Sequence, residues 1–537
     1  MESDFLKQLR DALGTQNVFD NNFATLHYGH STLNKKVAFI LGAVQPRTIQ
    51  EVAEIVALAS KHAVPLYPIS LGNNWGYGSK TPTTEKCLVV DLSRMNSILE
   101  FDETQGTITV EPGVTTLDVE RFLEDRNACF IAPTTGAGPL ASMIGNALEK
   151  GTSSASFFER FSSLLHLEAV LPDASVYSSY ISELSNSPTV PYKWATGPYL
   201  DGLFAQSGFG IVTKATFLLA PKPTYAKVLF VKGDKQEQID TLIGVMQKSL
   251  LSLGGTLSSF KVDGPIRSIA SFTRYKAVQE KSNALLSEET IKERLQLLSF
   301  GYWNCFGILQ GEKAVVKIAQ KILTKTLRAQ GFKAVFYDEK SLSSRRKFFG
   351  TFSRKIRERF AYLASAWVFL DRNLGRNLRF NGWFPVWRHA HPSIEPKDLA
   401  LVNLDDQANC GFIFFVSVLP VGISFSSFIG QAEALCSSYF VEPLYSFTSS
   451  QSRYIHFALQ ITFDKTSPEH ASKAERCYED LFRLAVSFGG LPYRVPNNMF
   501  HLLPEIMPNH WQLVKKIKEG LDPNNLMSPG RYVPTKK

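Results

Sequence analysis

A glycine-rich turn follows a helix-like and a strand-like segment near the start of the chain. Residues 49–63 carry apolar side chains at helical spacing, and residues 64–70 (VPLYPIS) form the short apolar run that is typical of a buried strand. The next residues, 71–78 (LGNNWGYG), include three glycines. Glycine adopts backbone conformations that other residues avoid and lets backbone amides approach a ligand closely. This order predicts a mixed α and β domain whose loop suits a phosphate, although an ordinary turn has the same composition.

Short strands and helices alternate through the first 222 residues. Apolar runs bounded by turn residues predict further strands at residues 87–93, 98–103, 106–113, 164–173 and 209–223. Residues 115–126 predict a helix that has Thr115 or Thr116 as its N-cap. Two prolines interrupt the last of these strands, and we therefore place a domain boundary near Lys222.

The middle of the chain changes in pattern from about Tyr225 to about Gly490. Helix-period segments such as residues 237–255 are interleaved with apolar strands such as residues 452–464. This arrangement predicts an antiparallel sheet flanked by helices. After it, the tail predicts a helix that ends at Gly520 and is followed by a turn punctuated by proline.

The composition describes an ordinary globular chain. Its 537 residues are 44% hydrophobic and 20% charged, which is enough for a large core and two or more domains. No segment approaches the roughly 18 uninterrupted apolar residues of a membrane span, and the first residues lack the basic start and apolar core of a secretory signal. We therefore expect a cytoplasmic protein without a membrane span. The net charge of +9 favours anionic partners only through long-range steering and does not indicate nucleic-acid binding.

The cysteines and the basic residues carry no clear chemical signal. The six cysteines are scattered without a CxxC pair or metal-ligand spacing, so we expect free buried thiols and no metal site. Basic and aromatic side chains alternate at helical spacing in residues 341–360. That pattern fits a membrane-surface or acidic-partner helix, or the commoner helix that packs its phenylalanines inward and leaves its basic face in solvent. The basic residues are Arg345, Arg346, Lys347, Arg354, Lys355, Arg357 and Arg359.

Four further segments follow the glycine-rich loop in a fixed order. They are VEPGVTTLDVE at 110–120, ASMIGNALEKG at 141–151, LFAQSGFGIVTKATFLL at 203–219 and LDPNNLMSPGR at 521–531. Together with the loop, these segments resemble the vanillyl-alcohol oxidase and p-cresol methylhydroxylase family of flavoproteins. The resemblance extends over nearly the whole chain and is strongest in residues 40–222 and 485–532.

The resemblance implies an α+β fold, with a two-part FAD-binding domain of the p-cresol methylhydroxylase type and an inserted cap domain. Residues 1–222 would form the first part of the FAD-binding domain, and residues 223–490 the substrate-binding cap, an antiparallel sheet flanked by helices. Residues 491–537 would return to the FAD domain. This division agrees with the change of pattern in the middle of the chain.

The implied cofactor is FAD, and its expected contacts lie in the glycine-rich loop and the four segments. They are Pro68, Ser70, Leu71, Gly72, Asn73, Asn74, Gly76, Tyr77, Gly78, Pro112, Gly113, Ser142, Gly145, Asn146, Gly210, Ile211, Val212 and Arg531.

The resemblance also implies a substrate site. Family members that act on para-substituted phenols hold the phenolate with two tyrosines and an arginine, and the matching residues are Tyr77, Tyr493 and Arg494. Hydride loss from a benzylic carbon is easiest from the phenolate, and two hydroxyl donors with a fixed cation lower the pKa of the phenol. The alternative for Tyr77 is a loop aromatic residue that only packs on the flavin. The alternative for Tyr493 and Arg494 is a strand tyrosine beside a surface arginine. We expect an FAD-dependent oxidase or dehydrogenase that takes hydride from a benzylic alcohol, an alkylphenol or a related compound.

Two more residues match catalytic positions of the family. Glu159 aligns with an aspartate that acts near the flavin in the oxidases, and a carboxylate there can take a proton or activate water. The alternatives are Glu149 in that role, or a solvated Glu159 paired with Arg160. His456 aligns with a histidine that faces the flavin and substrate pocket, where it would stabilise reduced flavin or the phenolate. The alternative is that His456 is a buried histidine of the core with no part in the reaction.

The attachment of the flavin is a separate question. His30 matches the histidine that assists covalent attachment, but the histidine that bonds to the flavin corresponds to Phe412. Phenylalanine cannot form that bond, and no tyrosine occurs between Arg388 and Ser438 to supply the tyrosyl linkage of the methylhydroxylases. We therefore expect non-covalent FAD.

The substrate stays open because the cap matches the family only in scattered places. The same fold could act on a sugar, a hydroxy acid or a natural-product intermediate, or could bind FAD without turnover. The electron acceptor would be oxygen or an acceptor protein, and the chain could form a homodimer.

Overall fold

The chain divides into two compact units in a computed structural model. Unit 1 contains residues 1–153, 159–221 and 495–537, and unit 2 contains residues 154–158 and 222–494. The residues that the structure describes are 4–34, 37–152, 159–179, 190–194, 196–273, 275, 284–350, 358–376, 403–407 and 409–533.

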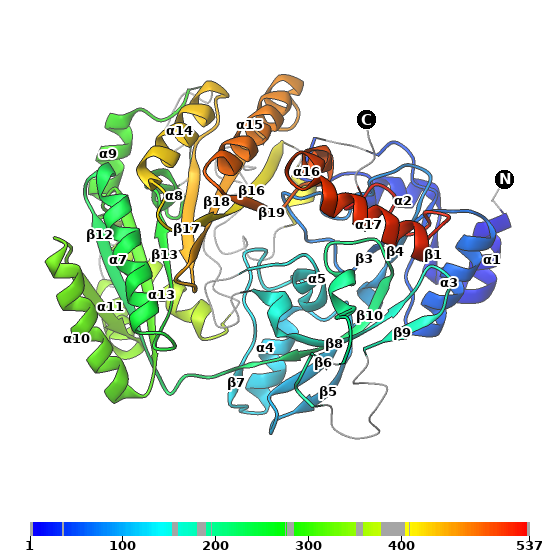
Figure 1. Cartoon of the computed structure of the whole chain (residues 1–537), viewed down its shortest axis with the longest axis horizontal. Helices are drawn as coiled ribbons and strands as arrows, with labels where there is room; N and C mark the ends of the chain where they lie inside the picture. Colours follow the sequence, from blue (N-terminus) through cyan, green and yellow to red (C-terminus); the bar gives the residue numbers. More distant parts are fainter. Residues whose placement is uncertain are drawn as a thin grey trace. The chain divides into compact units, whose positions relative to one another are not determined.

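Unit 1 opens with a four-stranded sheet in which three strands run parallel (Figure 1). In spatial order the strands are β1 (Val18–Phe19), β2 (Gly42–Val44), β4 (Leu88–Asp91) and β3 (Leu66–Ile69), with β1 antiparallel at the edge. The first helices are α1 (Asp4–Leu13), α2 (Asn21–Tyr28) and α3 (Ile49–Lys61). Leu9 of α1 and Ile55 of α3 are fully buried in one apolar core with residues of these strands. The helix and strand predicted before the glycine-rich loop are confirmed as α3 and β3.

A five-stranded antiparallel sheet forms the rest of unit 1. In spatial order its strands are β5 (Ile98–Asp102), β6 (Thr107–Val110), β10 (Ile211–Leu218), β8 (Leu164–Val170) and β9 (Val176–Ser178). The helices α4 (Thr116–Asp125) and α5 (Met143–Leu148) contribute to its core, and β7 (Phe130–Ile131) pairs with β11 (Ala220–Pro221). Thr115 caps α4 by accepting a hydrogen bond from the Asp118 amide and forms a capping box with the Asp118 carboxylate. The predicted strands and the predicted helix are confirmed, with Thr115 as the cap.

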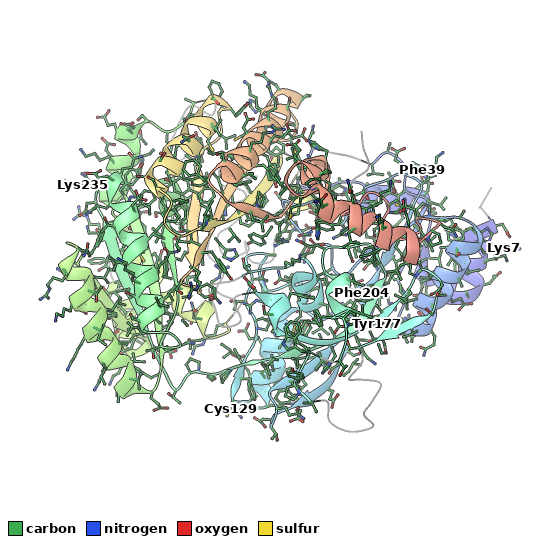
Figure 2. The ribbon with its side chains drawn as sticks, in the orientation of Figure 1. Lys7, Phe39, Cys129, Tyr177, Phe204 and Lys235 are labelled. Carbon is green, nitrogen blue, oxygen red and sulfur yellow. The ribbon has the colours of Figure 1, made fainter. Side chains whose placement is uncertain are left out.

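Aromatic packing fixes β9 to the turn that precedes β10. Tyr177 stacks on Phe204 with ring centroids 5.2 Å apart (Figure 2), and its hydroxyl donates to Asp201 at 2.6 Å. A Cβ atom on Gly210 would lie 2.9 Å from the Val170 carbonyl oxygen and 3.0 Å from the Phe204 ring. Glycine at 210 therefore lets the chain enter β10 close to this turn.

The C-terminal segment of unit 1 packs beside β3. Helices α16 (Leu503–Ile506) and α17 (Pro508–Leu521) lead into a stretch of turns, so the helix predicted to end at Gly520 ends one residue later and the predicted turn follows it. The Leu66 amide donates to the Leu526 carbonyl and the Ser528 amide to the Leu66 carbonyl, both at 2.8 Å. The fully buried Lys518 donates to the Gly208 and Met527 carbonyls, each at 2.6 Å. Backbone pairing and a buried cation thus join the two sequence parts of this unit.

Unit 2 contains an eight-stranded antiparallel sheet. In spatial order its strands are β15 (Ala334–Asp338), β12 (Tyr225–Gly233), β14 (Trp303–Gly311), β13 (Leu257–Asp263), β17 (Leu444–Ser449), β18 (Tyr454–Asp464), β16 (Cys410–Pro420) and β19 (Leu491–Arg494). Its helices include α7 (Ile239–Ser252), α8 (Pro265–Ala270), α9 (Glu288–Leu297), α10 (Lys313–Ala329), α11 (Glu339–Gly350), α13 (Ala361–Asn373), α14 (Phe425–Ser438) and α15 (Pro468–Ser487) (Figure 1). The antiparallel sheet flanked by helices is confirmed.

The two faces of this sheet differ in character. On one face α14 and α15 pack on aromatic residues, with the Phe428 and Phe457 rings 4.9 Å apart. On the other face α13 packs on β12 and β14, and the register places Lys261, Thr448 and His456 side by side on neighbouring strands. We call this second side, defined by those three residues and Gln460, the polar face.

The remaining expectations have mixed outcomes. The basic segment begins as α11, but Phe348 is 62% exposed, so this phenylalanine does not pack inward as expected, and residues 351–357 lie outside the described residues. The cysteines are free thiols, of which Cys129 is exposed and the others are buried. Among the described residues, none of the helices combines the length and the apolar character that a membrane crossing needs.

Candidate active site

The glycine-rich loop follows β3 in unit 1, as predicted. Its glycines Gly72, Gly76 and Gly78 have φ angles of +69°, +80° and +122°, which side chains rarely tolerate. A Cβ atom on Gly78 would lie 2.2 Å from Nδ2 of Asn497. The Gly76 amide donates to Oγ1 of Thr32 at 2.9 Å. The loop therefore needs glycine both for its backbone conformation and for the close approach of the C-terminal segment.

Tyr77 is held in this loop by backbone hydrogen bonds. Its amide donates to the Asn74 carbonyl at 3.1 Å, and its carbonyl accepts from the Asn497 amide at 3.0 Å. Its side chain is buried, with 3% of its surface exposed. Asn73 extends the same network by donating from Nδ2 to the Leu140 carbonyl at 2.9 Å. Asn497 was not predicted, because it lies far from the loop in sequence and belongs to no motif.

Helix α5 approaches the start of the loop. Ser142 caps α5 by accepting from the Gly145 amide at 2.9 Å, and its hydroxyl donates to the Pro112 carbonyl at 2.6 Å. A Cβ atom on Gly145 would lie 2.4 Å from Oγ of Ser70. The structure thus brings together Ser70, Pro112, Ser142 and Gly145, which the sequence places in three separate segments.

Further predicted cofactor residues lie elsewhere in unit 1. Pro68 lies on β3, and Ile211 and Val212 lie on β10 beside Val170 and Ala169 of β8. A Cβ atom on Gly113 would lie 2.5 Å from the Ser93 carbonyl oxygen. The Asn146 side chain donates to Oγ1 of Thr135 at 3.1 Å.

Arg531 forms a buried ion pair with Glu149. Tyr532 donates to the same carboxylate at 2.7 Å, and Arg531 donates to the Tyr67 hydroxyl at 3.2 Å. Although burial alone would lower the pKa of Arg531, Tyr67 and Glu149 raise it overall, so the guanidinium stays charged. The carboxylate of Glu149, which was the alternative to Glu159 as the carboxylate acting near the flavin, is therefore already bound by Arg531 and Tyr532.

Glu159 and Arg160 diverge in unit 1. Glu159 is exposed and accepts a 3.4 Å hydrogen bond from the Ser162 hydroxyl, whereas Arg160 is buried and donates to the Thr134 carbonyl at 2.7 Å. Burial lowers the pKa of Arg160 to about 9. Arg160 lines a small cavity together with Asn146 and Thr134. The carboxylate of Glu159 is thus in contact with solvent.

In unit 2, a β-bulge brings Tyr493 and His456 together on the polar face. Arg494 pairs with Val416 and Leu491 with Val418, so β19 has one residue more than β16 over this stretch. Successive side chains of a regular strand point to opposite faces, and the extra residue removes that alternation. The Tyr493 and His456 rings lie 5.0 Å apart and perpendicular to each other. Tyr493 therefore contacts His456, and the register places Arg494, opposite Val416, on the same face of the sheet. We call these three residues the Tyr493 group.

His456 is electrically neutral in this group. It lies on β18 opposite Val418 and is 5% exposed. Burial lowers the pKa of His456 to about 4. At neutral pH the ring offers one N–H donor and one acceptor and no positive charge, so Arg494 is the cation of the group.

Phe412 occupies the far end of β16. It pairs with Thr462 of β18, is buried, and its ring lies 5.8 Å from that of Phe414. Phenylalanine has no atom that could link to a flavin. His30 follows α2 in unit 1 and is half-buried.

The residues of unit 1 fit FAD. The loop of residues 71–78 combines three glycines in the left-handed region with side-chain amides, which suits a pyrophosphate. Nε1 of Trp75 in this loop is buried, with no hydrogen-bond partner among the described residues, and such a donor is normally satisfied by a ligand or water. Arg531 adds a fixed buried cation.

Two family models match the chain. An FAD binding domain matches residues 40–179, and the C-terminal domain of FAD linked oxidases matches residues 424–532. The chain is an FAD-dependent oxidoreductase. The matches confirm the cofactor and the enzyme class that the sequence predicted.

Known proteins similar to this flavoenzyme cover nearly its whole length. A 1'-carboxy-chondrochloren decarboxylase from Chondromyces crocatus is 26% identical over 98% of this chain and 96% of its own. The flavoprotein subunit of 4-cresol dehydrogenase (hydroxylating) from Pseudomonas putida is 26% identical over 91% of this chain and 87% of its own. The structure of p-cresol methylhydroxylase with substrate bound superposes with a TM-score of 0.83 at 22% identity, over 99% of this chain and 96% of that one. The predicted resemblance to this family and the p-cresol methylhydroxylase fold are confirmed.

Proposed function

We propose that this flavoenzyme takes hydride from the benzylic carbon of a para-substituted phenol. The observation that carries the proposal is the contact of the Tyr493 ring with the neutral His456 on the polar face, with the permanent cation Arg494 next to Tyr493 on β19. The similarity to 4-cresol dehydrogenase supports it. Unit 1 is proposed as the FAD-binding domain and unit 2 as the cap, with the predicted boundaries at 222 and 490 close to the division between the units.

In this mechanism the protein favours the ionised phenol. Arg494 and the Tyr493 hydroxyl bind the phenolate oxygen, and the role of Tyr77 as a second hydroxyl donor stays a prediction from the family resemblance. A charged donor in a water-poor site stabilises developing negative charge strongly and lowers the pKa of the phenol. Because His456 is neutral, its ring can donate one hydrogen bond, and its low pKa means that it does not take up the proton that the phenol loses. FAD, when bound, accepts the hydride.

Glu159 has a proposed role after hydride loss. The oxidised substrate is a quinone methide, which water attacks at the benzylic carbon. An exposed carboxylate such as Glu159 can accept the proton of that water, and the phenolate is restored when the new C–O bond forms.

The flavin is proposed to be non-covalent because Phe412 replaces the attachment residue. Acid or heat should release intact FAD from the purified protein. Flavin fluorescence that stays with the denatured polypeptide on a gel would contradict this part of the proposal.

A matched pair of substrates tests the proposed reaction. Hydride loss to a quinone methide needs the hydroxyl and the alkyl group in para positions, so 4-ethylphenol should bleach the flavin anaerobically and 3-ethylphenol should not. Equal bleaching by both isomers, or by neither while a sugar or hydroxy acid succeeds, would overturn the phenolic proposal.

The decarboxylase relative favours a second candidate reaction, on a phenol whose carboxylate is attached to the carbon next to the benzylic carbon. After hydride loss, the bond from carbon to the carboxylate breaks, its electron pair forms a vinyl double bond, the quinone methide returns to phenolate, and CO₂ leaves. Formation of a vinylphenol with an equal amount of CO₂ would identify this reaction, whereas a benzylic alcohol would identify hydration.

A further inference from the structure

A buried group of charges lies on the polar face away from the Tyr493 group. Lys261 and Asp263 alternate along β13 and therefore share this face, and their side chains form an ion pair at 2.7 Å. Arg267 from α8 reaches the same carboxylate at 2.9 Å, and one of its Nη atoms donates to Gln460 of β18 at 2.6 Å. Two cations thus share one carboxylate.

The groups around the Lys261 ammonium carry more positive than negative charge, because the single carboxylate of Asp263 faces two guanidinium groups. The charged groups that act most strongly on its ammonium are Asp263 from its own strand, Arg267 from α8 and Arg372 from α13. Burial, together with the two guanidinium groups, lowers the pKa of Lys261 to about 8 despite Asp263. The side chain remains 17% exposed, so Lys261 is less completely buried than Asp263 and Arg267, each of which is 10% exposed.

The strand register places Lys261 on the same face of the sheet as the proposed phenolate site. Lys261 pairs with Thr448, and Thr448 pairs with His456, so the three residues form one row across β13, β17 and β18. Two strand spacings separate the backbones of Lys261 and His456 by about 10 Å, and β16 and β19 lie beyond β18, so about 19 Å separates Lys261 from the β19 backbone that carries Tyr493 and Arg494. A phenol with a short para-substituent that ends in a carboxylate would lie along this row, with each end held by a long side chain.

We propose that Lys261 and Arg267 bind a carboxylate at the end of the substrate's para-substituent. This inference rests on the proposed function for the position of the phenol ring. One carboxylate can engage both cations, because Lys261 and Arg267 already share the Asp263 carboxylate. The carboxylate would align the substituent along the row and favour acidic phenols over neutral ones.

The test compares 3-(4-hydroxyphenyl)propionate with neutral 4-ethylphenol in anaerobic stopped-flow flavin reduction. Wild-type enzyme should bind the propionate at least about 10-fold more tightly, since charge-assisted contacts in a partly buried site are strong. Lys261→Met should raise the ratio of the Kd for the propionate to the Kd for 4-ethylphenol by roughly 10-fold or more. The matched control is Lys227→Met on β12, whose ammonium donates to Gln320 at 2.9 Å, and it should leave the ratio unchanged. An equal ratio in wild type and Lys261→Met would overturn the inference.

A measurement on wild-type enzyme covers the case in which Lys261→Met does not fold. Because deprotonation of Lys261 removes a cation, the Kd for the propionate should rise as the pH increases beyond about 8, while the Kd for 4-ethylphenol should not. A parallel pH dependence for both phenols would contradict the site. If neither phenol bleaches the flavin, the phenolic proposal fails alone. The carboxylate site is then tested by 3-phenylpropionate, whose Kd from the flavin absorbance spectrum should again increase in Lys261→Met, and an unchanged Kd would overturn it.

Discussion

At the scale of single residues, the bulge in β19 determines to which face of the sheet the side chains of Tyr493 and Arg494 point. Neighbouring strand residues normally point to opposite faces, and the bulge removes that alternation beside β16. The identities of the two residues could be predicted from the family resemblance. The bulge could not, because strand register depends on pairing with β16, more than 70 residues earlier in the sequence.

Arg494 gives the most specific prediction at this scale. Arg494→Ala should lower the rate of flavin reduction by a phenol roughly 10²- to 10³-fold, since it removes a preorganised charged donor to the phenolate. Arg494→Lys should recover only part of the rate, because lysine restores the charge but not the planar fork. Stopped-flow absorbance measures both rates.

The control for Arg494 is Arg483→Ala in α15. That side chain is half-exposed and reaches Glu479 and Asp480 only at 3.8 Å, so reduction should keep its wild-type rate. An Arg494→Ala enzyme that retains FAD and reduces as fast as wild type would show that no phenolate binds there.

At the scale of elements, some features of the glycine-rich loop could be predicted from the sequence and others could not. Its place after a strand and its need for positive φ angles follow from the sequence, and the structure has both. Its contact with Asn497 does not follow, because that partner arrives from the far end of the chain. The pairing of Lys261 and Asp263 on one face follows from strand alternation, but the arrival of Arg267 and Arg372 depends on helix packing that no local pattern encodes.

Gly78→Ala tests the loop. The added Cβ atom would meet Asn497 at a φ of +122°, and strain of about 1–3 kcal/mol should weaken FAD binding roughly 10- to 100-fold. Titration of the apoprotein with FAD measures the change. Gly430→Ala in α14 is the control, because nothing lies within 4 Å of its added Cβ atom, and FAD binding should not change. Wild-type affinity in Gly78→Ala would refute the packing argument.

At the scale of the whole molecule, unit 1 is built from two sequence-distant parts. The return of the C-terminal segment was predicted only through the family resemblance, since its own pattern shows just a helix and a turn. Lys518 and Asp522 are four residues apart, a spacing that usually marks an exposed helix pair. Here both are buried, and Asp522 also accepts from the Leu526 and Met527 amides at 2.7 and 2.8 Å.

Lys518→Met should destabilise unit 1 by about 3–5 kcal/mol, because it leaves the Asp522 charge buried without its cation. Lys515→Met, which removes an exposed lysine 3.7 Å from Glu519, should cost less than about 1 kcal/mol. Denaturant unfolding followed by flavin fluorescence compares them. Equal losses of stability in the two variants would mean that the buried lysine does not hold the segment.

The central claim is that the enzyme takes hydride from an ionised phenol. Anaerobic mixing with 4-ethylphenol and with 4-ethylanisole tests it most directly, because the methyl ether keeps the benzylic carbon and the ring but has no proton to lose. We predict that 4-ethylphenol bleaches the flavin and that 4-ethylanisole leaves it oxidised over the same period. Bleaching by both compounds at similar rates would contradict the claim.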